Sequence, residues 1–143
     1  SRNLGRAVRP PFWRVALPAK YKWRTNLDKY ISHYVTDLRE NRDALARGKL
    51  HEYSKRQREN SGFVVTLEGS YKQYPTWDHP EAHAFTRLRK LLAKQLLTSS
   101  KTLSATEVSV NERKIDDMVV RLEKLRTRNA SEIAKLTRKL EKG

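Results

Sequence analysis

Apolar residues recur every three or four positions along much of the chain, which is the spacing of one buried face on an α-helix. The first apolar stripe covers residues 27–45 and follows a capping-box pattern made by Thr25 and Asp28. Gly48 follows this stripe and indicates a helix end, because glycine tolerates the left-handed backbone conformation found there. No proline interrupts residues 49–60. This part of the chain therefore predicts two helices or one bent helix.

Residues 63–67 have the β-branched and aromatic composition of a strand and are bounded by glycine-containing turns. Residues 71–74 provide a return strand, which Pro75 then ends. The pattern predicts one short β-hairpin near 63–74. Because a single hairpin is marginally stable, it has to lie on helices or on a partner.

A third helix is predicted to begin at Pro80, since proline is tolerated in the first turn. Its apolar face consists of Phe85, Leu88, Leu91, Leu92 and Leu96. Its cations are expected mostly on the remaining circumference, and they are Arg87, Arg89, Lys90 and Lys94.

A polar linker over 98–104 leads to a long helix over 105–143. Ser104 and Glu107 form a second capping box, and neither proline nor glycine follows before Gly143. The helix carries a seven-residue apolar seam made by Val108, Ile115, Val119, Leu122, Ile133, Leu136 and Leu140. The seam is interrupted by Glu112, Arg126 and Asn129. It looks too narrow for a globular core and too broken for a long coiled-coil homodimer, so we expect a protruding helix that docks on another protein or on RNA.

The fold class expected from these patterns is mainly α. A small helical body over 26–97 carries the hairpin, an extended basic arm over 1–25 precedes it, and the long protruding helix follows the linker. With 37% hydrophobic and 33% charged residues, the composition does not favour a large single core.

The positive charge is concentrated at the N-terminus. The 143-residue chain has a net charge of +15, and every charged residue before Asp28 is basic. Prolines keep this segment extended, and its self-repulsion calls for a polyanion such as RNA phosphate. The predicted RNA-binding residues are Arg2, Arg6, Arg9, Arg14, Lys20, Lys22 and Arg24, with a second group at Lys55, Arg56 and Arg58. Two further groups of helical cations fit either solvated surface charge or phosphate contact, and they rank below the N-terminal cations. They are Arg87, Arg89 and Lys90 in the third helix, and Arg121, Lys124, Arg126 and Arg128 in the long helix.

Large aromatic residues in a segment without its own core are normally buried against something else. Burial against protein is favoured here over base stacking. The predicted protein-contact anchors are Phe12, Trp13, Trp23 and Trp77, together with Val119, Leu122, Ile133 and Leu136 of the long helix.

Nothing in the sequence indicates catalysis. There is no cysteine, and no apolar run approaches the roughly 18 residues of a membrane span. His79 and His83 have the spacing of two zinc-protease ligands, but Pro80 stands where that motif needs glutamate. Asp116 and Asp117 are adjacent on a helix and point in different directions. We therefore expect no enzyme activity, metal, cofactor or small-molecule substrate.

Three functional hypotheses follow. The favoured one is a structural subunit of a ribonucleoprotein, namely a ribosomal protein that contacts rRNA and neighbouring ribosomal proteins. Its arginine-rich, acid-free N-terminus and its tryptophan content favour a mitochondrial over a cytoplasmic location. The alternatives are a peripheral accessory subunit of a large mitochondrial assembly such as a respiratory complex, and a free-standing nucleic-acid-binding regulator. A homodimer through the long helix is the less favoured partner arrangement.

Overall fold

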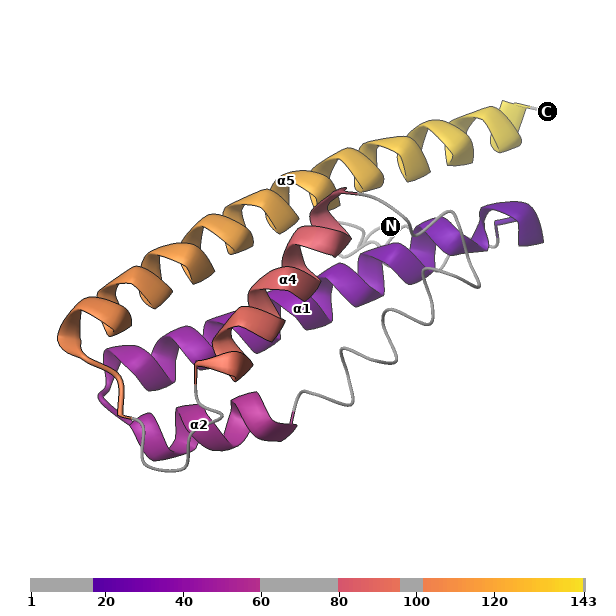
Figure 1. The fold of residues 1–143 in the computed structure, drawn as a ribbon. Helices are drawn as coiled ribbons and strands as arrows, with labels where there is room; N and C mark the ends of the chain where they lie inside the picture. Colours follow the sequence, from indigo (N-terminus) through magenta and orange to yellow (C-terminus); the bar gives the residue numbers. More distant parts are fainter. Residues whose placement is uncertain (1–16, 60–79, 96–101, 143) are drawn as a thin grey trace, which may run out of the picture.

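The chain is mainly helical in the computed structural model, which describes residues 17–59, 80–95 and 102–142 (Figure 1). The elements in chain order are a short 3-10 helix η2 (Ala19–Tyr21) and the helices α1 (Lys22–Ala46), α2 (Leu50–Glu59), α4 (Pro80–Lys94) and α5 (Ala105–Lys142). The hairpin predicted near 63–74 and residues 1–16 of the predicted arm lie outside the described residues.

The N-terminus of α1 differs from its prediction. The helix begins at Lys22, three residues before Thr25, and the Thr25 side chain donates a hydrogen bond back to the Lys22 carbonyl over 2.9 Å. Thr25 is therefore a residue of the first turn and not the helix cap. No proline lies between Pro18 and Pro75, so the helix extends back through residues that the sequence assigned to an extended arm.

Two local signals are confirmed. Gly48 lies between α1 and α2 with a φ of +68°, which is the left-handed conformation expected of a glycine after a helix end. At the start of α5, the Ser104 hydroxyl accepts a hydrogen bond from the Glu107 amide at 3.1 Å. The Glu107 carboxylate accepts one from the Ser104 amide at 3.0 Å. This reciprocal capping box satisfies two amides that the helix start leaves without partners.

Helix α5 lies antiparallel along α1, and these two helices make the most extensive contact between elements (Figure 1). Three side-chain pairs fix the register. Arg24 donates to the Asn129 side chain at 3.1 Å, Arg126 contacts Asp28 at 3.0 Å, and Arg42 pairs with Glu112. Each polar residue that interrupts the apolar seam of α5 therefore meets a partner on α1. The interruptions match the two helices to each other instead of breaking the interface.

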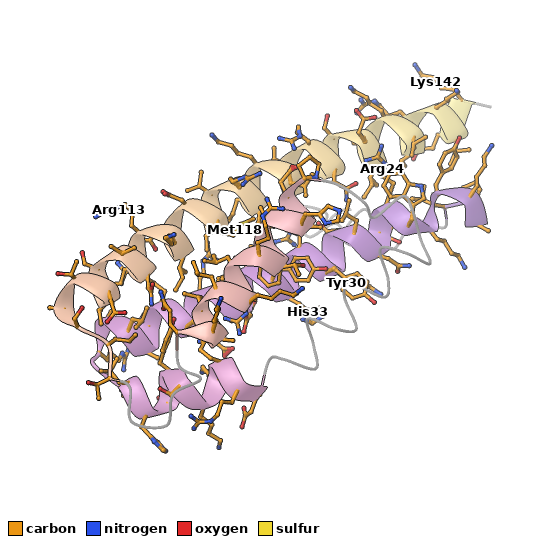
Figure 2. The ribbon with its side chains drawn as sticks, in the orientation of Figure 1. Arg24, Tyr30, His33, Arg113, Met118 and Lys142 are labelled. Carbon is orange, nitrogen blue, oxygen red and sulfur yellow. The ribbon has the colours of Figure 1, made fainter. Side chains whose placement is uncertain are left out.

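This packing corrects the expectation of a protruding helix. Leu122 and Ile133 are fully buried within the chain, as are Ile115 and the Asn129 side chain. The seam is wide enough for a core because α1 covers one side of it and α4 covers another. Figure 2 shows Met118 pointing from α5 toward α4.

The core lies between α1, α4 and α5. The rings of Tyr34 in α1 and Phe85 in α4 stack with their centroids 4.4 Å apart. The predicted apolar face of α4 is confirmed at Phe85, Leu88 and Leu92, all buried, whereas Leu91 is 38% exposed. Leu96, the last residue of that predicted face, lies outside the described residues.

A buried polar cluster joins α4 to α1 and α2. The Arg89 side chain, predicted on the outside of α4, is only 1% exposed, and its Nε lies 3.2 Å from Oδ2 of Asp37. Its Nη1 donates to the Gln57 amide oxygen at 2.9 Å, and the Gln57 amide nitrogen donates in turn to Asn41. Tyr53 is buried beside this cluster. The polar cluster fixes where α4 sits because buried polar groups need their partners.

Candidate nucleic-acid interface

The charges of α5 are separated onto two sides of the helix. Glu112, Asp116 and Glu123 are spaced four and seven residues apart, which places them on one side. That side faces α1. Arg42 pairs with both Glu112 and Asp116, the latter at 3.0 Å, and Arg39 pairs with Glu123. These acidic residues are therefore partly neutralised within the chain.

The outer side of α5 is left strongly basic. Its cations repeat at intervals of three, four, seven or eight residues and fall within an arc of roughly 100° at 3.6 residues per turn. We call this surface the basic face, and it consists of Arg113, Arg121, Lys124, Arg128, Lys135, Arg138, Lys139 and Lys142. All eight are exposed. Of the acidic residues, Asp117 shares the face and Glu132 lies at its edge.

Figure 2 shows Arg113 and Lys142 near opposite ends of α5, both pointing away from the rest of the molecule. The 38-residue helix is about 57 Å long, so the basic face forms a row of cations along one edge of the fold. Some members have partners within the chain. Arg128 contacts Glu81 at 3.1 Å and Lys135 contacts Glu132 at 3.5 Å, but both cations keep more than 60% of their side chains exposed. A row of exposed cations on a rigid helix suits a polyanion.

The predicted RNA-binding residues at the start of α1 fall into two groups. Lys20 and Lys22 are exposed. Arg24 is half-buried, its guanidinium lies 4.2 Å from the centre of the Trp23 ring, and it also donates to Asn129. Figure 2 shows Arg24 directed toward α5. Arg24 therefore joins α1 to α5, and its contact with phosphate stays a prediction.

The basic group at the end of α2 is also occupied by contacts within the chain. Arg56 is half-buried and lies 3.4 Å from Glu40 and 3.7 Å from Glu52. Lys55 is exposed and contacts Glu59 at 3.8 Å. Arg58 also takes part in an interaction within the chain. Lys55 and Arg58 nevertheless stay exposed, so contact of this group with phosphate remains a prediction.

The predicted protein-contact anchors are mostly used inside the fold. Trp23 and Val119 are half-buried against the core, and Leu136 is half-buried. Leu122 and Ile133 are fully buried, which leaves neither side chain available to another protein. The predicted anchors Phe12, Trp13 and Trp77, and the predicted cations Arg2, Arg6, Arg9 and Arg14, lie outside the described residues.

The prediction named only part of the basic face. The sequence left Arg121, Lys124 and Arg128 undecided between solvation and phosphate contact, and the cations at both ends of the helix were not named at all. Their spacing along 113–142 contains the missing signal. The same set included Arg126, which pairs instead with the nearly buried Asp28 carboxylate.

No helix in the part of the chain that the structure describes is long and apolar enough to cross a membrane. Within those ranges, no group of three histidine or acidic side chains is placed to hold a metal ion. His83 is half-buried on α4, and His79 lies outside the described residues.

Comparison with the known protein families, the curated proteins and the solved structures found no match to this chain.

Proposed function

We propose that this protein is a non-catalytic, RNA-binding structural subunit of a ribonucleoprotein, and specifically a ribosomal protein. The observation that carries the proposal is the separation of charge on α5. Glu112, Asp116 and Glu123 pair with arginines of α1, and eight of the α5 cations form an exposed row on the outer side of the helix.

This separation is what a helix needs if it is to lie against phosphate. Mixed charges on one face would repel as many phosphates as they attract, whereas the basic face presents eight cations and one acidic residue. The acidic residues serve another purpose because their pairs with Arg39 and Arg42 help to hold α5 in place. The inner side of α5 therefore builds the fold while the outer side is free to bind.

The N-terminal cations add to this surface in the proposal. The chain has seven basic residues before its first acidic residue, Asp28, and Lys20 and Lys22 are exposed where this segment enters α1. The cations of the N-terminal segment and those of α5 would both neutralise backbone phosphate without reading sequence. Neighbouring proteins of the particle would surround the rest of the protein. The proposed mitochondrial location rests on the composition of the first 24 residues.

Sedimentation of tagged protein from a native lysate, with and without ribonuclease, tests the proposal. We expect comigration with a ribosomal subunit that is lost after digestion. Comigration with a large particle that survives ribonuclease would support a protein-only assembly such as a respiratory complex. A slowly sedimenting free species would support a soluble regulator.

A matched pair of variants ties the result to the basic face. The basic-face variant carries Arg113→Gln, Arg121→Gln, Lys124→Gln and Arg138→Gln. The control variant removes the same charge from exposed positions elsewhere through Lys29→Gln, Lys49→Gln, Arg87→Gln and Lys94→Gln. Glutamine has nearly the helix propensity of lysine and arginine, so both variants are expected to fold. The proposal requires that the basic-face variant leaves the particle at lower salt than the control variant does.

A further inference from the structure

We infer that the basic face of α5 binds the phosphate backbone of double-stranded RNA, independently of its sequence. This inference rests on the proposed function, because it takes RNA as the polyanion and names the form of RNA that this surface accepts.

The first argument is the chemistry that the basic face lacks. Recognition of single-stranded RNA relies on aromatic side chains that stack on splayed bases. Helix α5 contains no phenylalanine, tyrosine, tryptophan or histidine anywhere in its 38 residues. The positions between the cations on the outer side are Asp117, Val120 and Ser131. The basic face therefore offers charge to phosphate but no platform for a base.

The second argument is the location of the aromatic residues that the structure does describe. Tyr34, Tyr53 and Phe85 are buried in the core, and Tyr30 is half-buried against it. Tyr21 and Trp23 are half-buried at the N-terminal end of α1, with Lys20 over the Tyr21 ring and Arg24 over the Trp23 ring. None of these rings lies on the outer side of α5. In a duplex the bases are already stacked on each other, so a surface without aromatic groups loses nothing by binding one.

The third argument is geometric. The cations from Arg113 to Lys142 extend over about 44 Å of one uninterrupted helix, with no proline or glycine to bend it. A straight, rigid rod suits the regular backbone of a duplex, which is recognised mainly by shape and by contacts to phosphate and 2′-hydroxyl groups. A flexible single strand would gain little from this rigidity.

The experiment measures binding of the full chain to labelled RNA by fluorescence anisotropy at several salt concentrations. The probes are two duplexes of about 20 base pairs with unrelated sequences, and the separate strands of one duplex. The wild-type protein, the basic-face variant and the control variant are compared, with circular dichroism to verify that each is folded.

We expect the two duplexes to bind wild-type protein with equal affinity. The basic-face variant should lose at least tenfold in duplex affinity, and its slope of log K against log salt should fall by up to about four, one for each cation removed. Its affinity for the single strands should change much less than its duplex affinity, and the control variant should keep most of its duplex affinity. An equal loss on single strands and duplexes would overturn the inference and leave the proposed function standing. No binding of wild-type protein to any RNA at low salt would overturn both.

Discussion

Removal of the buried arginine in the polar cluster should destabilise the protein by about 3–5 kcal/mol. In the variant Arg89→Met, the Asp37 carboxylate loses the guanidinium that lies 3.2 Å away, and the Gln57 amide oxygen loses its donor. Breaking a buried ion pair by removing one partner costs about this much because the other charge stays buried and uncompensated. Since domains of this size are stable by only about 5–15 kcal/mol, the effect is easily measured.

The loss should grow as the pH rises. Burial raises the pKa of Asp37 above its ordinary value, and the Arg89 guanidinium opposes that rise. Without the guanidinium, the pKa of Asp37 rises further, so the folded state holds a proton that the unfolded state has already released. Between the pKa of Asp37 in the unfolded chain and its higher pKa in the folded variant, the variant loses stability with increasing pH, by at most about 1.4 kcal/mol per pH unit.

Urea unfolding of wild-type protein and Arg89→Met, followed by circular dichroism between about pH 5 and 8, measures both effects. The double variant Asp37→Leu with Arg89→Met provides the control, because it removes both charges. Its destabilisation should be smaller than the sum of the two single variants by about 2 kcal/mol or more. A loss below about 1 kcal/mol for Arg89→Met, additive single variants, or a loss independent of pH would each refute the reasoning.

Three further predictions concern single positions. Gly48→Ala should cost about 1–2 kcal/mol in urea unfolding, because a Cβ at a φ of +68° is strained although nothing lies within 4 Å of it, and Gly48→Asn should cost less. Ser104→Ala should cost about 1 kcal/mol by removing the acceptor for the Glu107 amide, and Ser104→Asp, which keeps an acceptor, should restore most of it. Burial raises the pKa of Tyr53 to about 12, so the difference in alkaline absorbance between wild-type protein and Tyr53→Phe should appear near that pH and not near 10.

The parts of the fold predicted correctly from the sequence depend on neighbouring residues alone. Gly48 ends a helix because of its own backbone, and Ser104 and Glu107 cap α5 within a single turn. The apolar face of α4 also follows from spacing within fifteen residues. Such signals are complete in a short window of sequence.

Apart from the start of α1, where the local capping signal at Thr25 was wrong, the errors arose where the outcome depends on a helix far away in the chain. The seam of α5 looked broken because Glu112, Arg126 and Asn129 interrupt it, and only the register against α1 reveals their partners. Arg89 looked like one surface cation among several, because Asp37 and Gln57 lie 52 and 32 positions away in sequence. The basic face was predicted in part for a related reason, since only the packing of α5 shows which of its sides remains exposed.

The antiparallel pairing of α1 with α5 has a consequence for synthesis on the ribosome. Helix α1 leaves the exit tunnel early, but the side chains that bury Leu27, Ile31 and Leu38 include those of α5, which emerges about 80 residues later. Contacts such as that between Arg24 and Asn129 close a loop of 105 residues. The fold therefore cannot be completed while only the N-terminal helices have left the ribosome. The apolar stripe of α1 stays uncovered in the nascent chain until α5 has been synthesised.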